Sequence, residues 1–280
     1  YTVKGIEEDK AEIIVFDGNF HGRTTTIVSF SSDPEYRFGF GPFTPGFTIL
    51  PYGDLEAVKA AMNPNVCAVL VEPIQGEAGI VAPPDGFLAG LRKLTTDHNA
   101  LLVCDEIQSG LGRTGRLFAY EHENVRPDIV IIGKALSGGM YPVSAILADD
   151  EVMGVFKPGE HGSTYGGNPL GAAVAREALK VLTEERMVER SAELGDFFME
   201  QLSTIESDHI EQIRGKGLWI GIVLTEQSGG ARRFCEALQN RGLLCKETHH
   251  TVIRVAPPLT ISRDEITWAV EQIREVLTTM

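Results

Sequence analysis

The chain has 280 residues, of which 43% are hydrophobic and 23% are charged. These proportions are close to those of globular proteins and exclude a fibrous or an intrinsically disordered chain. The longest uninterrupted apolar run, Val66–Val71, is much shorter than the roughly 20 residues that a membrane-spanning helix needs. The net charge of −14 repels phosphate groups and argues against a nucleic-acid-binding protein, although a local basic pocket is compatible with it.

The cysteines lack the close spacing that is typical of zinc sites and disulfide frameworks. They are Cys67, Cys104, Cys235 and Cys245. We interpret them as free thiols in a reducing compartment, with the cytoplasm as the expected location, or the mitochondrial matrix in a eukaryote. His249 and His250 are weak evidence for a metal site, because neighbouring residues on a strand point to opposite faces. No metal is therefore expected.

Short apolar runs alternate with amphipathic stretches over the first two thirds of the chain. Strands are expected at Glu12–Phe16, Phe47–Pro51, Val66–Val71, Ala100–Asp105, Ile129–Gly133 and Val143–Ala148. Helices are expected at Leu55–Met62 and Gly86–His98, with Asp54 and Asp85 as their N-caps. Because the strands are apolar throughout and are separated by helices, we expect an α/β fold with a mainly parallel sheet that is covered on both faces.

A long helical block at Leu170–Ile205 follows, and the pattern changes after Ser207. The expected order there is a strand at Leu218–Leu224, a helix at Ala231–Arg241, a strand at Val252–Val255 and a helix at Asp264–Leu277. We therefore expect a large domain at residues 1–206 and a small C-terminal α+β domain at residues 207–280.

A charged residue stands at the carboxyl end of each of the apolar strands expected at Ala100–Asp105 and Ile129–Gly133. These residues are Asp105 and Lys134, one strand–crossover–strand unit apart. Ligands of open parallel sheets bind beyond the carboxyl ends of the strands, so we expect both side chains at one edge of the sheet. This juxtaposition is compatible with three chemistries.

The first two chemistries are only weakly supported. An apolar strand ending in Asp105-Glu106 resembles the magnesium-binding strand of P-loop ATPases, but the GxxxxGK[ST] loop is missing from these residues. Gly110-Leu-Gly112-Arg-Thr-Gly115 matches a dinucleotide motif, but these glycines do not directly follow a strand, and the acidic strand end would repel a pyrophosphate. A basic-tipped loop is the better interpretation of the glycines.

The third chemistry is that of pyridoxal phosphate. This cofactor needs a carboxylate at its pyridine nitrogen and a lysine amine that forms a Schiff base with it. Asp105 and Lys134 would supply both groups. On these two residues alone, however, an N-cap aspartate and a solvent-exposed lysine are the more ordinary explanation.

Six segments in order resemble those of the class III pyridoxal-phosphate-dependent aminotransferases. They are Gly18-Asn-Phe-His-Gly-Arg-Thr24, Gly39-Phe-Gly-Pro-Phe-Thr-Pro-Gly46, Val71-Glu-Pro-Ile-Gln-Gly-Glu-Ala-Gly79, Asp105-Glu-Ile-Gln108, Gly133-Lys-Ala-Leu-Ser-Gly-Gly139 and His161-Gly-Ser-Thr-Tyr-Gly-Gly-Asn-Pro169. The resemblance covers the chain from about Glu12 onward. It implies the aspartate-aminotransferase type of fold (fold type I) and pyridoxal 5′-phosphate as cofactor. The second and sixth segments favour ornithine over acetylornithine or 4-aminobutyrate as the amine donor.

The resemblance also implies roles for the cofactor-binding residues. Lys134 is expected to attach the cofactor and to move the substrate proton, and Asp105 is expected to pair with the pyridine nitrogen, which raises the pKa of that nitrogen. The other implied contacts are Phe20 and Ile107 on the two ring faces, Gln108 at the phenolic oxygen, and Ser163 and Thr164 at the phosphate across a dimer interface.

For the substrates, the resemblance implies two cationic anchors. Arg254 is expected to hold the α-carboxylate of glutamate or 2-oxoglutarate, since a guanidinium grips a carboxylate with two hydrogen bonds. Glu77 is expected to pair with Arg254 while ornithine binds and to release it for glutamate. Arg23 resembles the arginine for the remote carboxylate. His21, at a position that is aromatic in some members, is a further expected substrate contact.

The implied reaction moves the δ-amino group of L-ornithine to 2-oxoglutarate and gives glutamate 5-semialdehyde and glutamate, in a homodimer or larger assembly without nucleic acid or membrane. Acetylornithine transaminase, 4-aminobutyrate transaminase, a related aminomutase and a catalytically incomplete fragment remain alternatives. The chain begins at Tyr1 and family members are longer at the front. We therefore expect that part of the small domain, a glycine- and alanine-rich phosphate loop and tyrosine contacts to ornithine precede it.

Overall fold

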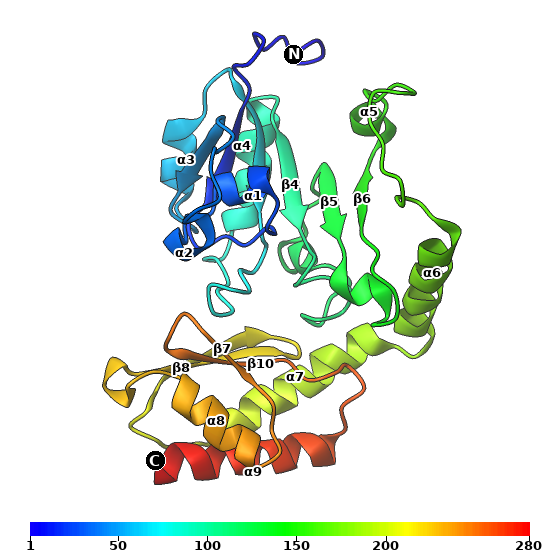
Figure 1. The fold of residues 1–280 in the computed structure, drawn as a ribbon. Coiled ribbons are helices and arrows are strands. Elements are labelled where there is room, and N and C mark those ends of the chain that lie inside the picture. Colours follow the sequence, from blue (N-terminus) through cyan, green and yellow to red (C-terminus); the bar gives the residue numbers. More distant parts are fainter. The chain divides into compact units, whose positions relative to one another are not determined.

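The computed structural model describes residues 1–280, and the chain divides into two compact units. The first unit comprises residues 1–73, 83–108 and 120–180, and the second comprises residues 74–82, 109–119 and 181–280. Each unit contains its own β-sheet (Figure 1). None of the helices combines the length and the apolar character that are required to cross a lipid bilayer.

The first unit is built on a six-stranded sheet with the strand order β2-β1-β3-β4-β5-β6. Its strands are β1 (Glu12–Phe16), β2 (Phe47–Leu50), β3 (Val66–Val71), β4 (Leu101–Asp105), β5 (Ile129–Ile132) and β6 (Ala145–Ala148). All neighbouring strands are parallel except β5 and β6, which are antiparallel. The expected mainly parallel sheet is therefore confirmed, and its antiparallel edge is the strand expected at Val143–Ala148.

One face of this sheet carries the core of the unit. Leu102 and Cys104 of β4 are fully buried in a cluster with Phe16 of β1 and with Leu91, which belongs to helix α4 (Phe87–Asp97). Successive residues of a strand point to opposite faces, so Asp105 points away from the face that α4 covers. The remaining helices of the unit are α1 (Thr25–Ser29), α2 (Pro34–Arg37), α3 (Leu55–Ala61), α5 (Asp150–Met153), the first part of α6 (Pro169–Glu184) and the 3₁₀ helices η1 (Ala119–Glu123) and η2 (Lys134–Ser137).

The two predicted helix caps have different outcomes. Asp54 caps α3 as expected, because its Oδ1 accepts a hydrogen bond of 2.9 Å from the N–H of Ala57. The prediction of Asp85 as the N-cap of α4 is wrong. Gly86 holds that position with a φ of 84°, which glycine adopts without a Cβ penalty, and no side chain of the turn caps the helix. Instead, the Glu123 carboxylate accepts the N–H of Ala89 at 3.0 Å.

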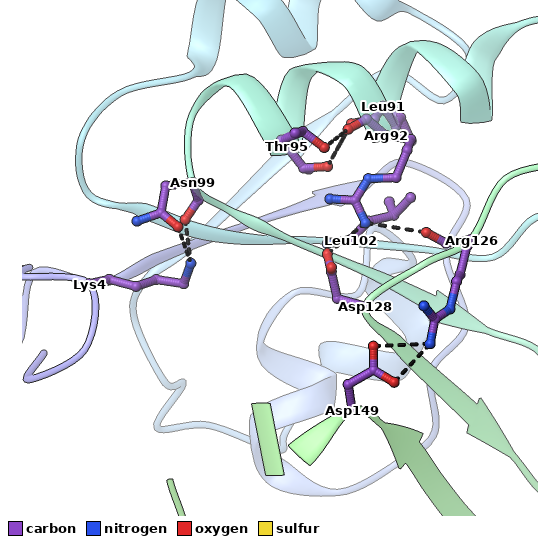
Figure 2. Close-up of polar contacts among 10 residues, drawn as sticks. Lys4, Leu91, Arg92, Thr95, Asn99, Leu102, Arg126, Asp128 and Asp149 are labelled. Carbon is purple, nitrogen blue, oxygen red and sulfur yellow. Dashed lines mark hydrogen bonds and ion pairs between the residues drawn. The ribbon is translucent and has the colours of Figure 1, made fainter. Parts of the chain in front are cut away.

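A polar network fixes the strands that carry the site (Figure 2). Asp128, directly before β5, accepts hydrogen bonds from the N–H of Leu102 at 2.7 Å and from Nη1 of Arg92 at 2.8 Å. The Asp128 N–H donates in turn to the Leu102 carbonyl at 2.9 Å. Nearby, Nη2 of Arg126 bonds both carboxylate oxygens of Asp149, at 2.8 and 3.0 Å. The Asp128 contacts tie β5 to β4 and α4, and the Arg126–Asp149 pair ties the start of β5 to the end of β6. All of them lie at the ends of the strands away from Asp105 and Lys134.

The second unit is built on a four-stranded antiparallel sheet with the order β7-β8-β10-β9. Its strands are β7 (Ile210–Lys216), β8 (Trp219–Leu224), β9 (Lys246–Thr248) and β10 (Val252–Val255). The two central strands were predicted, whereas the edge strands β7 and β9 were missed. Edge strands are rich in polar residues, as the sequences IEQIRGK and KET illustrate, so they lack the apolar run that marks a central strand.

Three helices pack on this sheet: α7 (Met187–Ser203), α8 (Arg232–Asn240) and α9 (Arg263–Thr279), and a short 3₁₀ helix η3 (Glu226–Ser228) follows β8. Phe198 of α7, Phe234 of α8 and Ile273 of α9 are fully buried in one core with Ile222 and Ile253 of the central strands. Ser262 and Glu265 form a reciprocal capping box at the start of α9.

The helical block predicted at residues 170–205 is interrupted. Arg186 has a φ of 54°, so α6 ends before it and α7 starts after it. Helix α7 packs against β7 and α9, and the C-terminal segment of the second compact unit begins within α6, at Val181. The division into domains at residues 1–206 and 207–280 stays a prediction.

Candidate active site

A cavity of about 70 Å³ lies in the first unit, where β4 and β5 end. It is lined by Phe20, His21, Gly22, Glu72, Asp105, Ile107, Gln108 and Lys134. Most of the residues expected at the cofactor ring therefore line one cavity, at the edge of the sheet where α/β proteins bind ligands. Figure 1 shows β4 and β5 side by side, with η2 following β5.

Asp105 is the last residue of β4 and is only 5% exposed. Its Oδ1 accepts the N–H of Ile107 at 3.1 Å, and its Oδ2 lies 2.7 Å from Nδ1 of His21. Both side chains of this pair are buried, so little water competes for the contact. The structure thus places His21 as a partner that orients the Asp105 carboxylate, and the substrate contact expected of His21 stays a prediction.

Lys134 follows β5 as the first residue of η2, with a φ of 39°. Side chains other than glycine rarely adopt this left-handed backbone, and such strained residues cluster at functional sites. The residue is exposed, and it lines both the cavity and an adjoining open groove of about 760 Å³. Tyr141, Tyr165 and Asn168 also line this groove. The amine is therefore accessible to a ligand from the wider side.

Phe20 and Ile107 line the cavity with half-buried apolar side chains. The N–H of Phe20 donates at 2.9 Å to Oε2 of Glu72, which is 5% exposed and follows the carboxyl end of β3. Glu72 had been assigned no role from the sequence. The available signal was the acidic residue directly after the apolar run Val66–Val71, the same signal that identified Asp105.

Gln108 provides a test of whether a cofactor ring fits here. Its Nε2 is buried and has no hydrogen-bond partner, and an unsatisfied buried donor costs about 1–3 kcal/mol. A ligand oxygen in the cavity would satisfy this donor. A pyridoxal ring requires a carboxylate, an amine, apolar side chains on its faces and a hydrogen-bond donor for its oxygen. The cavity offers a buried carboxylate, an accessible amine, two apolar side chains and an unsatisfied amide donor, so the residues present fit that group.

Ser163, Thr164 and Arg23 do not line the cavity. Ser163 and Thr164 lie in the exposed segment between α5 and α6, where the Ser163 hydroxyl accepts the N–H of Gly166 at 3.1 Å. The guanidinium carbon of Arg23 lies 4.4 Å from the centre of the Tyr36 ring, in a cation–π contact. The anion-binding roles expected of these three residues stay predictions.

A second cluster of predicted residues lies in the second unit. Oε1 of Glu77 accepts a hydrogen bond from Nη1 of Arg254 at 2.9 Å, and the other carboxylate oxygen lies 3.4 Å from Nζ of Lys246. Burial raises the pKa of Glu77, but the charges and hydrogen bonds of Arg254 and Lys246 outweigh it and lower the pKa overall. The structure thus brings Glu77 and Arg254 together, as their expected pairing requires, and it adds Lys246, which sequence reasoning missed.

Similarity to known proteins identifies the class to which this arrangement belongs. Residues 1–277 match the family Aminotransferase class-III. The chain is 57% identical over 277 residues to an ornithine aminotransferase of Brevibacillus brevis, covering 99% of this chain and 69% of that protein. The structure of the ornithine aminotransferase from Toxoplasma gondii superposes with a TM-score of 0.96 at 42% identity and covers 99% of this chain and 66% of that one. An acetylornithine aminotransferase from Elizabethkingia anophelis has a TM-score of 0.86 at 44% identity, covering 99% of this chain and 68% of that one.

The fold and the cavity are those of a pyridoxal-phosphate-dependent aminotransferase of fold type I. The chain belongs to the class III aminotransferase family, an enzyme family that uses pyridoxal 5′-phosphate. The resemblance inferred from the six sequence segments is confirmed, and it supersedes the magnesium and dinucleotide alternatives. The chain spans about two thirds of the length of the relatives described above.

Proposed function

We propose that the intact protein transfers the δ-amino group of L-ornithine to 2-oxoglutarate, giving glutamate 5-semialdehyde and glutamate. The observation that carries this proposal is the single cavity lined by both Asp105 and Lys134, in a chain 57% identical to ornithine aminotransferases. The carboxylate and the amine are the two groups that the cofactor requires for amino transfer.

When bound, pyridoxal phosphate supplies an electron-withdrawing ring that stabilises negative charge at the reacting substrate carbon. Asp105 would keep a proton on the ring nitrogen by presenting a carboxylate to it, and His21 would hold that carboxylate in one direction. Lys134 would accept a proton from the substrate carbon and deliver it to the cofactor. Gln108 would donate its unused N–H to the ring oxygen.

The ion pair Glu77–Arg254, called the gate pair below, would distinguish the two substrates. Ornithine presents its δ-amine for transfer, so Arg254 need not bind its carboxylate and stays paired with Glu77. Glutamate presents its α-amine, so its α-carboxylate needs a cation, and the guanidinium of Arg254 supplies two parallel N–H donors once it is released. Arg23 would hold the second carboxylate of glutamate.

We further propose that the protein acts as a homodimer in which Ser163 and Thr164 bind the cofactor phosphate of the partner subunit. The segment that carries them is exposed and includes Phe156 and Tyr165, whose side chains are 56% and 77% exposed. Large exposed apolar side chains next to polar residues are typical of a surface that a second chain covers. Sedimentation of the full-length protein checks this proposal, because a monomer at micromolar concentration would contradict it.

The activity is tested with the full-length protein, pyridoxal phosphate and 2-oxoglutarate as acceptor. L-ornithine, N-acetylornithine and 4-aminobutyrate are offered as donors, and glutamate formation is measured. We expect the highest kcat/KM with ornithine and no turnover by Lys134→Ala. A preference for N-acetylornithine would instead support the second candidate function, which the similarity to an acetylornithine aminotransferase raises. Undiminished turnover by Lys134→Ala would refute the assignment of the amine.

A further inference from the structure

We propose that Lys246 is a specificity-determining residue, which holds the Glu77 carboxylate when Arg254 leaves it and so permits the gate pair to open for dicarboxylate substrates. This inference rests on the proposed function and deepens it, because it assigns a residue to the switch between the two halves of the reaction. The residue belongs to β9, and the sequence pattern had assigned it no role.

The two cations of this cluster share one carboxylate. Lys246 and Arg254 are directly opposite each other on the neighbouring antiparallel strands β9 and β10. Like charges at such positions repel each other. Glu77 offsets this repulsion because one carboxylate oxygen lies 2.9 Å from Arg254 and the other lies 3.4 Å from Lys246. The carboxylate therefore already has a second cationic partner before Arg254 moves.

The burial of the three side chains differs in a way that suits an exchange of partners. The side chains of Glu77 and Arg254 are each only 19% exposed, so leaving either charge without a partner is unfavourable. An incoming α-carboxylate would compensate Arg254. The released Glu77 carboxylate would depend on Lys246, whose side chain is 60% exposed and needs no partner of its own.

Lys246 is directed to Glu77 and not to the acidic residue beside it. Glu247, its neighbour on β9, bonds the guanidinium of Arg232 at 2.9 Å. Neighbouring residues of a strand point to opposite faces, so Glu247 and Lys246 are on different faces of the sheet. The pairing of β9 with β10 therefore places Lys246 opposite Arg254, where both cations reach the Glu77 carboxylate.

The hairpin that carries Glu77 is itself held to the sheet. Nε and Nη2 of Arg214 both donate to the carbonyl oxygen of Gly79, at 3.0 and 2.9 Å. Gly79 has a φ of 103°, and a Cβ there would lie 3.0 Å from Val252. This close packing fixes the backbone near Glu77, so the change of partner has to occur through side chains.

The test separates the two half-reactions in the full-length holoenzyme by following the absorbance of the cofactor. Lys246→Met should lower kcat/KM for glutamate by about 1.4- to 5-fold, the range for a solvent-exposed ion pair, and leave kcat/KM for ornithine unchanged. Lys246→Arg should keep the parent ratio of kcat/KM for glutamate to kcat/KM for ornithine, because it keeps the positive charge. Lys59→Met is the matched control, since Lys59 is 63% exposed and lies 3.7 Å from a carboxylate of Glu56 on α3.

Removal of the carboxylate gives an independent check. In a Glu77→Gln background the substitution Lys246→Met should have no further effect on the ratio of the two kcat/KM values, because there is no charge left to hold. An unchanged ratio in Lys246→Met alone, or an equal loss in both half-reactions, would overturn the inference. A parent enzyme that does not convert ornithine would refute the proposed function. An unchanged ratio in Lys246→Met, in a parent enzyme that does convert ornithine, would refute only the role of Lys246.

Discussion

Replacement of His21 by Phe decides whether this residue touches the substrate or orients Asp105. The substitution keeps an aromatic ring in the cavity but removes the nitrogen that lies 2.7 Å from the Asp105 carboxylate. The two side chains are 3% and 5% exposed, so water does not replace the lost partner. The carboxylate keeps its hydrogen bond from the Ile107 N–H and becomes free to rotate about it.

The size of the effect follows from this burial. A hydrogen bond to a charged group contributes about 1.5–3 kcal/mol, and each 1.36 kcal/mol corresponds to a factor of ten. If the whole contribution is lost in the transition state, kcat for ornithine falls by about 10- to 150-fold. We expect KM to change much less, because the contact is made to Asp105 and not to ornithine.

The assay is steady-state turnover of ornithine with saturating 2-oxoglutarate in the full-length enzyme. His98→Phe is the control, since His98 is an exposed residue on the C-cap of α4, and it should behave like the parent. In an Asp105→Asn background, His21→Phe should cause little further loss. A large increase in KM at unchanged kcat would refute this reasoning and favour the direct substrate contact.

Three further predictions concern the cofactor, the gate pair and the second unit. Gln108→Leu should raise the melting temperature of the cofactor-free protein, because it removes an unsatisfied buried donor, and should reduce the additional stabilisation on adding pyridoxal phosphate; an equal shift in both forms would contradict the role of Gln108. Glu77 has a pKa below its usual value of 4.5, so its charge stabilises the fold above that pH and the benefit is lost as the pH falls through the lowered pKa. The difference in unfolding free energy between the parent and Glu77→Gln should therefore shrink between pH 6 and pH 3, and urea titrations that show a constant difference would argue against it. Ser262→Ala removes the capping box of α9 and should cost about 1 kcal/mol in urea unfolding, whereas Ser203→Ala, at the last residue of α7, should cost less.

The strands of the first sheet were predictable because each one is a short apolar run, and their parallel order made the positions of Asp105 and Lys134 predictable as well. The hydrogen bond between His21 and Asp105 was not, since the two residues are 84 positions apart and only tertiary structure brings them together. Lys246 was missed for a related reason. A lysine on a short polar strand is ordinary in a sequence, and its partner Glu77 is 169 positions away.

Local backbone geometry explains the remaining differences. The predicted N-cap Asp85 is a favourable residue for that position, but the left-handed conformation of Gly86 moves the start of α4 one residue further along the chain. Within the predicted helical block, the reversal of φ at Arg186 is not signalled by a glycine or proline, the residues that usually mark a helix end. Both differences depend on a single dihedral angle, which a pattern of apolar residues does not encode.

The bonds that Asp128 makes to Leu102 have a consequence for altering this enzyme. They set the alignment of β5 on β4, and a slip by one residue would move Lys134 by about 3.3 Å along the strand direction and turn each side chain of β5 to the opposite face. The spacing between the amine and the Asp105 carboxylate is thus determined at the end of the sheet away from the cavity. A library aimed at new amine donors can vary the groove residue Tyr141, whereas substitutions at Asp128 should lower activity without touching any ligand.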